Sequence, residues 1–294
     1  MPAFRASAHN RHAVRIDAHQ HFWRYAAREF RWIDSRMGRI ARDFMPADLA
    51  PELAALGFDG CIAVQARASL AETEFLLALA REHAFVRGVV GWVDLCSPGV
   101  AGELERRAAE PCFKGVRHAV QDEPDERFLL RPDFLRGMHA LARFELVYEL
   151  LVHPRHLEVA RRFAAQFSEQ PLVLDHLAKP AIARGERDPW ARQIRALAEL
   201  PHVTCKLSGL VTEARWNAWR PADFRFYLEV ALEAFGEERL LFGSDWPVCL
   251  LAAESYRQVA ELVHDWSEAL TPAARAKLFG LNAARIYRLE QDRE

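Results

Sequence analysis

Eight short apolar stretches recur along the chain, and segments with helical spacing separate most of them. These stretches are predicted to be strands, at residues 15–23, 60–65, 86–94, 112–118, 144–151, 171–176, 203–208 and 239–245. Helices are predicted at residues 47–56, 70–83, 99–109, 133–142, 156–167, 189–200 and 221–235. Strands that alternate with helices favour a parallel sheet, and eight such units in roughly 250 residues are typical of a closed (β/α)8 barrel, the TIM barrel.

An open, doubly wound sheet is the main alternative fold. Such a sheet would carry a glycine-rich phosphate turn after its first strand, where this chain has HQHFW at residues 19–23. Because no linker or low-complexity tract divides the chain, residues 1–294 are predicted to form one domain. Residues 1–13 are expected to be a flexible extension, and residues 256–294 to form helices packed outside the barrel.

Composition excludes several classes of partner. The formal net charge is only -2, so the chain has no strong field that would attract nucleic acid or a membrane surface. The five cysteines are far apart and odd in number, which argues against a disulfide framework. We find no secretory signal and no apolar stretch long enough to span a bilayer, and therefore expect a cytoplasmic protein. The oligomeric state is left open, and a homo-oligomer is compatible with the sequence.

Two histidines stand at the end of the first predicted strand. Side chains two residues apart lie on the same side of a strand, so His19 and His21 can converge on one point. Two histidines in this spacing are a weak signal when nothing else is known. The histidine pair becomes informative together with the other polar residues at strand ends, because a (β/α)8 barrel builds its site where the carboxyl ends of its strands meet.

Polar side chains stand at or near the ends of all eight predicted strands. They are His19, His21, Gln65, Asp94, Lys114, Arg117, His118, Glu149, His153, His176, Lys206, Ser208 and Asp245. Each alone has a structural explanation: Asp245 could cap a helix, Lys206 could reach solvent, and His153 could lie in a solvated loop. Together they predict a site that combines several imidazoles with a carboxylate.

Five motifs follow one another in the order of these strands: DAHQHFW, KGVRH, LDHLAKP, KLSG and FGSDWPV. The ordered set resembles the amidohydrolase superfamily, in the branch of sugar-lactone hydrolases that includes L-fuconolactonase-like and L-rhamnonolactonase-like enzymes. The resemblance covers roughly residues 14–289 and implies a (β/α)8 barrel with hydrolase activity on a cyclic ester. It also implies that His19, His21, His176 and Asp245 line the reaction centre.

The metal content that the resemblance implies is open. Other branches hold two metal ions, with a carboxylated lysine or a glutamate at the end of strand four and a further histidine at the end of strand five. The match to that pattern is incomplete, because Lys114 stands early in its motif and strand five offers Glu149, with His153 only later. A single zinc held by His19, His21, His176 and Asp245 is chemically reasonable. The lactonase branch implies that no metal is required, and we expect turnover without an essential metal.

The expected mechanism is water attack on a lactone carbonyl. Asp245 is the candidate base, and His19, His21 and His176 are expected to donate hydrogen bonds to the carbonyl oxygen. Sugar hydroxyls are expected to contact a set of polar side chains, with tryptophans stacked on the ring. The substrate-binding candidates are Lys114, Arg117, His118, Glu149, Lys206, Ser208, Trp23 and Trp246. Trp32 is a third tryptophan that could stack on the ring. Core packing is the alternative for each tryptophan.

The predicted substrate is L-fuconolactone or a related aldonolactone. One alternative is a zinc-dependent decarboxylase or amide hydrolase on the same barrel, and a less favoured one is a sugar-binding barrel without catalysis. The chain has neither the GxSxG elbow of serine hydrolases nor a Walker phosphate loop, which argues against those chemistries.

Overall fold

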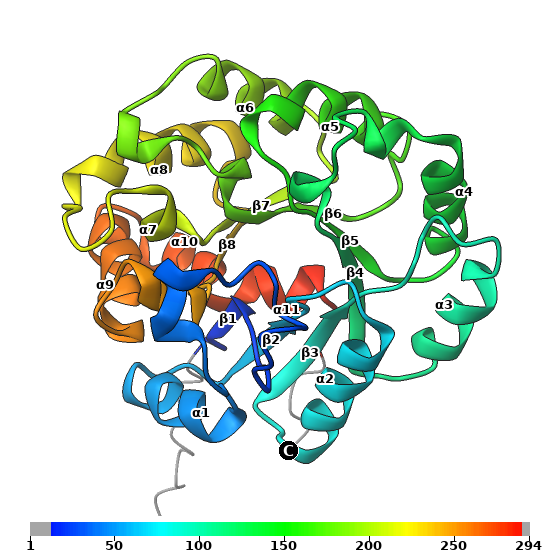
Figure 1. Ribbon diagram of the computed structural model, residues 1–294. Coiled ribbons are helices and arrows are strands. Elements are labelled where there is room, and N and C mark those ends of the chain that lie inside the picture. The colour runs from blue at the N-terminus through cyan, green and yellow to red at the C-terminus, as the bar shows by residue number, and fades with distance from the viewer. Residues whose placement is uncertain (1–12, 290–294) are drawn as a thin grey trace, which may run out of the picture.

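The computed structural model of the protein describes residues 13–289, so the predicted flexible extension falls almost wholly outside the described residues. Eight parallel strands pair in sequence order and form a barrel, which confirms the predicted fold (Figure 1). The strands are β1 (Ile16–Gln20), β2 (Gly60–Val64), β3 (Val86–Gly91), β4 (Phe113–His118), β5 (Val147–Leu150), β6 (Leu172–Leu174), β7 (Val203–Leu207) and β8 (Leu240–Phe242).

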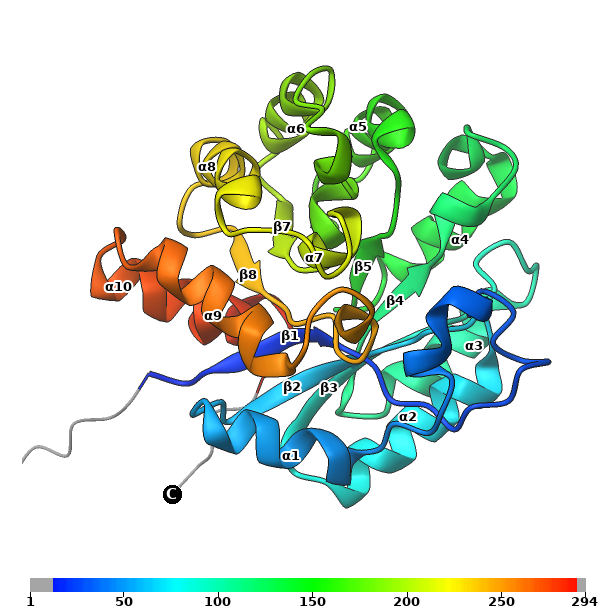
Figure 2. The same ribbon diagram turned by 60° about the vertical axis from the view of Figure 1, so that its left-hand side comes forward.

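Helices surround the strands, as both ribbon views show (Figures 1 and 2). They are α1 (Pro46–Ala55), α2 (Leu70–Glu82), α3 (Val100–Ala108), α4 (Pro132–Leu141), α5 (Leu157–Ala164), α6 (Trp190–Ala198), α7 (Leu210–Glu213), α8 (Ala222–Phe235), α9 (Tyr256–Ser267), α10 (Pro272–Ala276) and α11 (Asn282–Ile286). Sequence signals explain their bounds: the Ser69 side chain caps α2, accepting a hydrogen bond from the backbone N–H of Glu72. None of the helices within residues 13–289 has the length and apolar character that a membrane span needs.

Two apolar clusters fill the barrel. The larger one lies between the strands and the surrounding helices, and the smaller one fills the interior near the amino ends of the strands. Tyr287, at the end of α11, belongs to the interior cluster together with Ile16 and Val173. Residues 256–289 were expected to pack wholly outside the barrel, but part of this segment does not. Helix α11 contacts β1 and β8 and places Tyr287 beneath the strands.

Two helical glycines give a matched test of how tightly the helices pack. A Cβ at Gly137 in α4 would lie 1.9 Å from the backbone oxygen of Leu95, whereas a Cβ at Gly102 in α3 would meet nothing within 4 Å. We expect Gly137→Ala to lower the free energy of unfolding by at least about 1–3 kcal/mol, as overpacking does. Gly102→Ala should be neutral or stabilising by up to about 1 kcal/mol, because alanine favours helices. Denaturant unfolding of both variants measures this, and equal effects would contradict the packing described here.

Candidate active site

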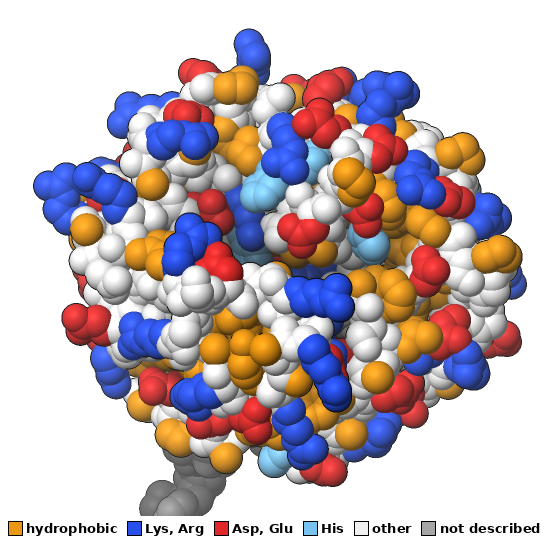
Figure 3. All heavy atoms as spheres, viewed as in Figure 1, with side chains coloured by type: hydrophobic (Ala, Val, Ile, Leu, Met, Phe, Trp, Pro, Cys, Tyr) orange, Lys and Arg blue, Asp and Glu red, His pale blue; other side chains and the backbone are white. Residues whose placement is uncertain are grey.

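A cavity of about 330 Å³ opens at the carboxyl ends of the strands. The space-filling view shows this face hollowed at its centre, with histidine side chains in the hollow and both acidic and basic side chains around it (Figure 3). Residues from five of the strand ends line the cavity: His21, Gln65, Arg117, His176 and Asp245. The structure therefore places this cavity where the sequence predicted the site, at the carboxyl ends of the strands.

Backbone hydrogen bonds bring the end of β1 against the loop after β8. The N–H of Asp245 donates to the carbonyl of His19 over 2.8 Å, and the N–H of His21 donates to the carbonyl of Trp246 over 2.7 Å. Asp245 itself has a φ of +57°, a left-handed conformation that an aspartate adopts more readily than most residues. These contacts place the Asp245 carboxylate beside both histidines.

Three imidazoles converge on one carboxylate oxygen. The distances from Asp245 Oδ1 to Nε2 are 3.3 Å for His21, 3.8 Å for His19 and 4.0 Å for His176. All four side chains are buried. The four residues that the sequence predicted for the reaction centre are thus brought together from three segments, at or just after the ends of β1, β6 and β8.

The other ring nitrogens of His21 and His176 are also engaged. His21 Nδ1 lies 2.7 Å from the carbonyl oxygen of Val64, which can only accept, so Nδ1 carries a proton and neutral His21 has its lone pair on Nε2. His176 Nδ1 lies 2.9 Å from Ser208 Oγ, which can donate or accept. Gly209 makes room for this ring, because a Cβ there would lie 2.5 Å from it.

The surroundings of Asp245 keep its carboxylate ionised beside the uncharged rings of His19 and His176. Burial alone would raise the pKa of Asp245, but the nearby imidazoles, foremost His176, outweigh burial and hold this pKa below its usual range. Burial lowers the pKa of His176 to about 4 and that of His19 well below its ordinary value. At neutral pH, Asp245 is therefore ionised while His19 and His176 are uncharged.

A layer of paired charges lies beneath the imidazoles, inside the barrel. Arg117 donates a 2.9 Å hydrogen bond to Asp175, and Lys206 donates a 2.6 Å hydrogen bond to Glu149. Both cations also contact His19: Arg117 Nη1 is 3.2 Å from its Nε2, and Lys206 Nζ is 3.1 Å from its Nδ1. Glu149 and Lys206, predicted to bind sugar hydroxyls, are fully buried in this layer and support His19 from below.

The comparisons with known proteins agree with this geometry. The amidohydrolase family model matches residues 16–289. The chain belongs to the amidohydrolase family. It is 48% identical over 293 residues to an L-fucono-1,5-lactonase of Burkholderia multivorans, covering 95% of this chain and 97% of the relative. An L-fucono-1,5-lactonase of Burkholderia ambifaria is 39% identical over 284 residues, covering 94% and 96%.

A solved amidohydrolase structure from Burkholderia multivorans, which contains bound zinc, matches the fold with a TM-score of 0.89 at 48% identity. The match covers 95% of this chain and 100% of that one. The predicted superfamily and the predicted barrel are both confirmed.

Two residues of β4 that were predicted to bind substrate do not reach the site. His118, the residue after Arg117, faces the other side of the strand, whereas a register shift between β3 and β4 places Lys114 beside Gly88 and Ile62, away from the cavity. Lys114 donates to the carbonyl of Arg288 at the amino end of the barrel. His118 binds Glu123 over 2.7 Å and stacks on Phe128. Neither side chain lines the site cavity.

Two of the three tryptophans expected to stack on a sugar ring are core residues instead. Trp23 and Trp246 are nearly fully buried, and both pack against Phe44. Ser208 is also buried and reaches the site only through His176. His153 lines a neighbouring cavity and does not join the cluster around Asp245.

Sequence reasoning missed several residues of the cavity mouth. Lys179, Glu213 and Trp216 line the cavity, whereas Trp32, which also lines it, was among the tryptophans expected to stack on the ring. Lys179 ends a run of four residues with positive φ that begins at His176, so one left-handed turn presents both side chains to the cavity. The LDHLAKP motif contains Lys179, but only the backbone conformation shows that it faces the site.

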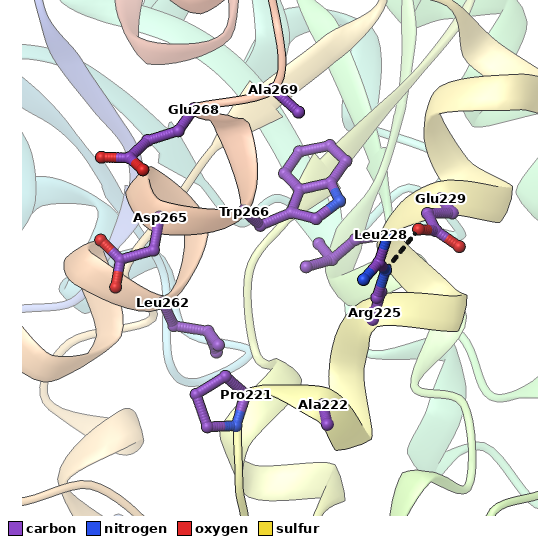
Figure 4. A pocket seen from close by; sticks show the side chains of 10 residues that line it. All are labelled: Pro221, Ala222, Arg225, Leu228, Glu229, Leu262, Asp265, Trp266, Glu268 and Ala269. Atoms are coloured by element: carbon purple, nitrogen blue, oxygen red, sulfur yellow. Dashed lines mark hydrogen bonds and ion pairs between the residues drawn. The ribbon is translucent and has the colours of Figure 1, made fainter.

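A larger cavity, of about 600 Å³, lies on the outside of the barrel and is not the active site. It is a groove between α8 and α9, where Trp266 and Leu228 face each other beside an Arg225–Glu229 hydrogen bond (Figure 4). The groove contains no histidine, and the carboxylates of Asp265 and Glu268 point away from Trp266 (Figure 4). Size alone would therefore point to the wrong site.

Arg117 tests the charged layer. Arg117→Met removes one of the cations beside Asp175, whose side chain is fully buried. We expect a loss of at least about 3 kcal/mol in the free energy of unfolding, because a buried carboxylate is left underpaired. Arg131→Met is the matched control, since Arg131 pairs with Asp133 at the surface, and it should leave stability nearly unchanged. Thermal unfolding of both variants measures this, and an equally stable Arg117→Met protein would contradict the pairing.

Proposed function

We propose that the protein hydrolyses a sugar-acid lactone, with L-fuconolactone as the best candidate. The observation that carries the proposal is the convergence of three imidazoles on the buried Asp245 carboxylate, at the mouth of a barrel whose relatives are L-fucono-1,5-lactonases. A cavity of about 330 Å³ is at the small end of ligand pockets and suits one sugar ring.

Asp245 acts as the general base. It takes a proton from water as the water oxygen attacks the lactone carbonyl carbon, which gives a tetrahedral intermediate with a negative oxygen. The intermediate collapses as the bond from the carbonyl carbon to the ring oxygen breaks, and Asp245 returns its proton to that oxygen. A weak base suffices because the ester is activated within its ring, and the low pKa of Asp245 keeps it ionised.

The cationic and imidazole groups stabilise the negative oxygen. Arg117 lines the cavity and donates from a fixed guanidinium, and His176 offers Nε2 on the same side as Asp245. His21 has a different role from the expected donor, because its Nδ1 proton is committed to Val64. In the neutral state, its Nε2 accepts a hydrogen bond from the attacking water and orients that water beside Asp245.

Substrate hydroxyls meet charged and aromatic side chains at the cavity mouth. Glu213 accepts hydrogen bonds and Lys179 donates them, while Trp32 and Trp216 cover the apolar face of the ring. Both signs of charge are present, so the cavity suits a neutral polyol ring better than a dicarboxylate. We therefore keep an aldonolactone as the substrate class.

Zinc fits part of the donor set. His21 presents a lone pair on Nε2, and His176 and Asp245 face the same point, which is the ligand chemistry that zinc prefers. His19 fits less well, because Arg117 and Lys206 approach its two ring nitrogens and both can only donate. A bound zinc would be held by His21, His176 and Asp245 and would polarise the lactone carbonyl. We propose that turnover does not need it.

Proton release in weakly buffered indicator solution tests the activity and its metal requirement. We expect the protein to open L-fucono-1,5-lactone and related aldonolactones, and to keep its rate after prolonged chelation and removal of the chelator. Metal analysis of the same sample confirms that zinc is gone. Loss of the rate that zinc alone restores would overturn the metal-independent mechanism, and no turnover on any lactone would overturn the function.

The role of Asp245 is tested by Asp245→Asn, which keeps the shape of the side chain and removes its basicity. We expect kcat to fall by about a hundredfold to ten-thousandfold, as the loss of a general base does. Asp94→Asn is the matched control: Asp94 stands after β3, is exposed, and is absent from the site cavity, so its kcat should not change. Near-normal kcat in a folded Asp245→Asn protein would refute Asp245 as the base.

A further inference from the structure

A second cluster of ligand-type side chains lies below the reaction centre. The ligand atoms of His19, Glu149 and Asp175 all lie within 4.8 Å of one another, and all three residues are fully buried. An imidazole and two carboxylates at this separation form the kind of set that holds a divalent cation in other proteins. None of these atoms can reach solvent, so whatever neutralises the carboxylates must be inside the barrel.

The Lys206 ammonium sits inside this cluster. Its Nζ lies 2.6 Å from Glu149 Oε1, 3.2 Å from Asp175 Oδ1 and 3.1 Å from His19 Nδ1. The Lys206 side chain comes from β7, points into the barrel and has no exposed surface. It therefore contacts every member of the cluster at once, as a central ion would.

Charge and hydrogen bonding are consistent with this position. Arg117 and Lys206 supply two positive charges beside the carboxyl groups of Asp175 and Glu149. Burial raises the pKa of Glu149 to about 7, and the two cations oppose that rise. Two buried oxygens in the cluster, Asp175 Oδ1 and Glu149 Oε2, accept no hydrogen bond from the described residues. The contact of Asp175 Oδ1 with Lys206, at 3.2 Å, is therefore an ion pair and not a hydrogen bond. Tyr287 donates to Glu149 from below, so the floor of the barrel holds the cluster in place.

We propose that Lys206 is a built-in replacement for a metal ion, a covalently attached cation that occupies the His19–Glu149–Asp175 cluster and fixes His19 at the reaction centre. An ion bound by three residues can exchange with solvent, whereas a lysine on a strand cannot leave. Lys206 is a positioning residue, because its ammonium contacts His19 and does not line the cavity that receives substrate. Only its effect on turnover rests on the function proposed above.

Replacing the lysine by an uncharged side chain of similar length is the direct test. We expect folded Lys206→Met protein, chelated and then titrated with Co²⁺, to bind one more ion per chain than the wild type does. The double variant Lys206→Met/Glu149→Gln is the matched control and should lose this extra ion, because one carboxylate ligand is gone. Differences from wild type cancel any binding at Asp245 or at the exposed His264, Asp265 and Glu268, which all three proteins share.

The same variants give two further readouts. Co²⁺ should raise the unfolding temperature of Lys206→Met by more than that of the wild type, since a ligand that binds only the folded state stabilises it. We expect kcat of metal-free Lys206→Met to fall about tenfold or more with little change in KM, as loss of a residue that orients a functional histidine does. This kinetic change needs a lactone that the wild type hydrolyses, whereas ion binding does not.

Each outcome of these experiments either supports or overturns the proposal. Folded Lys206→Met that binds no extra Co²⁺, or an extra ion that survives Glu149→Gln, would overturn the proposal. If Lys206→Met folds only when Co²⁺ is supplied, the proposal is supported, because the ion then replaces the ammonium. If it folds neither with nor without Co²⁺ while the double variant folds, the cluster cannot hold an ion and the proposal fails.

Discussion

A buried carboxylate and two backbone hydrogen bonds join the first and last strands of the barrel. Asp17 in β1 accepts hydrogen bonds from the N–H and the hydroxyl of Ser244, at 2.9 and 2.6 Å, and from Tyr256 at 3.1 Å. Within the described residues, β1 and β8 form no ladder of their own, and an isolated bridge joins Gln20 to Trp246. Closure here therefore depends on the Asp17 side chain together with the two backbone hydrogen bonds donated by Asp245 and His21. These contacts also place Asp245, the next residue after Ser244, beside the histidines.

Closure and chemistry are linked by an irregularity in β1. Ile16 and Ala18 face the apolar interior, so strict alternation would turn His19 away from it. The pairing of β1 with β2 shifts register between Asp17 and Gln20, and beyond this shift His19 and His21 face the same carboxylate. The interior of the barrel is consequently layered: apolar side chains at the floor, paired charges above them, and imidazoles at the mouth.

Much of the fold was predictable because strands and helices follow patterns of fixed period. Eight apolar stretches predicted eight strands, and their ends supplied a set of polar candidates. The resemblance to the amidohydrolase superfamily then pointed to His19, His21, His176 and Asp245 among them. Predictions for single positions within a strand were less accurate. KGVRH was interpreted as one group, but of its Lys114, Arg117 and His118 side chains only Arg117 lines the site cavity. Glu149 and Lys206 were assigned to the mouth, but they stand further back along their strands and reach each other inside the barrel.

The cavity mouth was the least predictable part, because it depends on backbone conformations that no periodicity reveals. His176, Leu177, Ala178 and Lys179 all have φ between +51° and +57°, and none is glycine. Such conformations cost roughly 1–2 kcal/mol per residue for side chains with a Cβ. Burial of Leu177 and Ala178 and the hydrogen bond from Trp190 to the carbonyl of Leu177 oppose that cost. The strained turn is what aims His176 at Asp245 while Lys179 reaches the mouth, so catalysis and substrate contact are set by one local conformation.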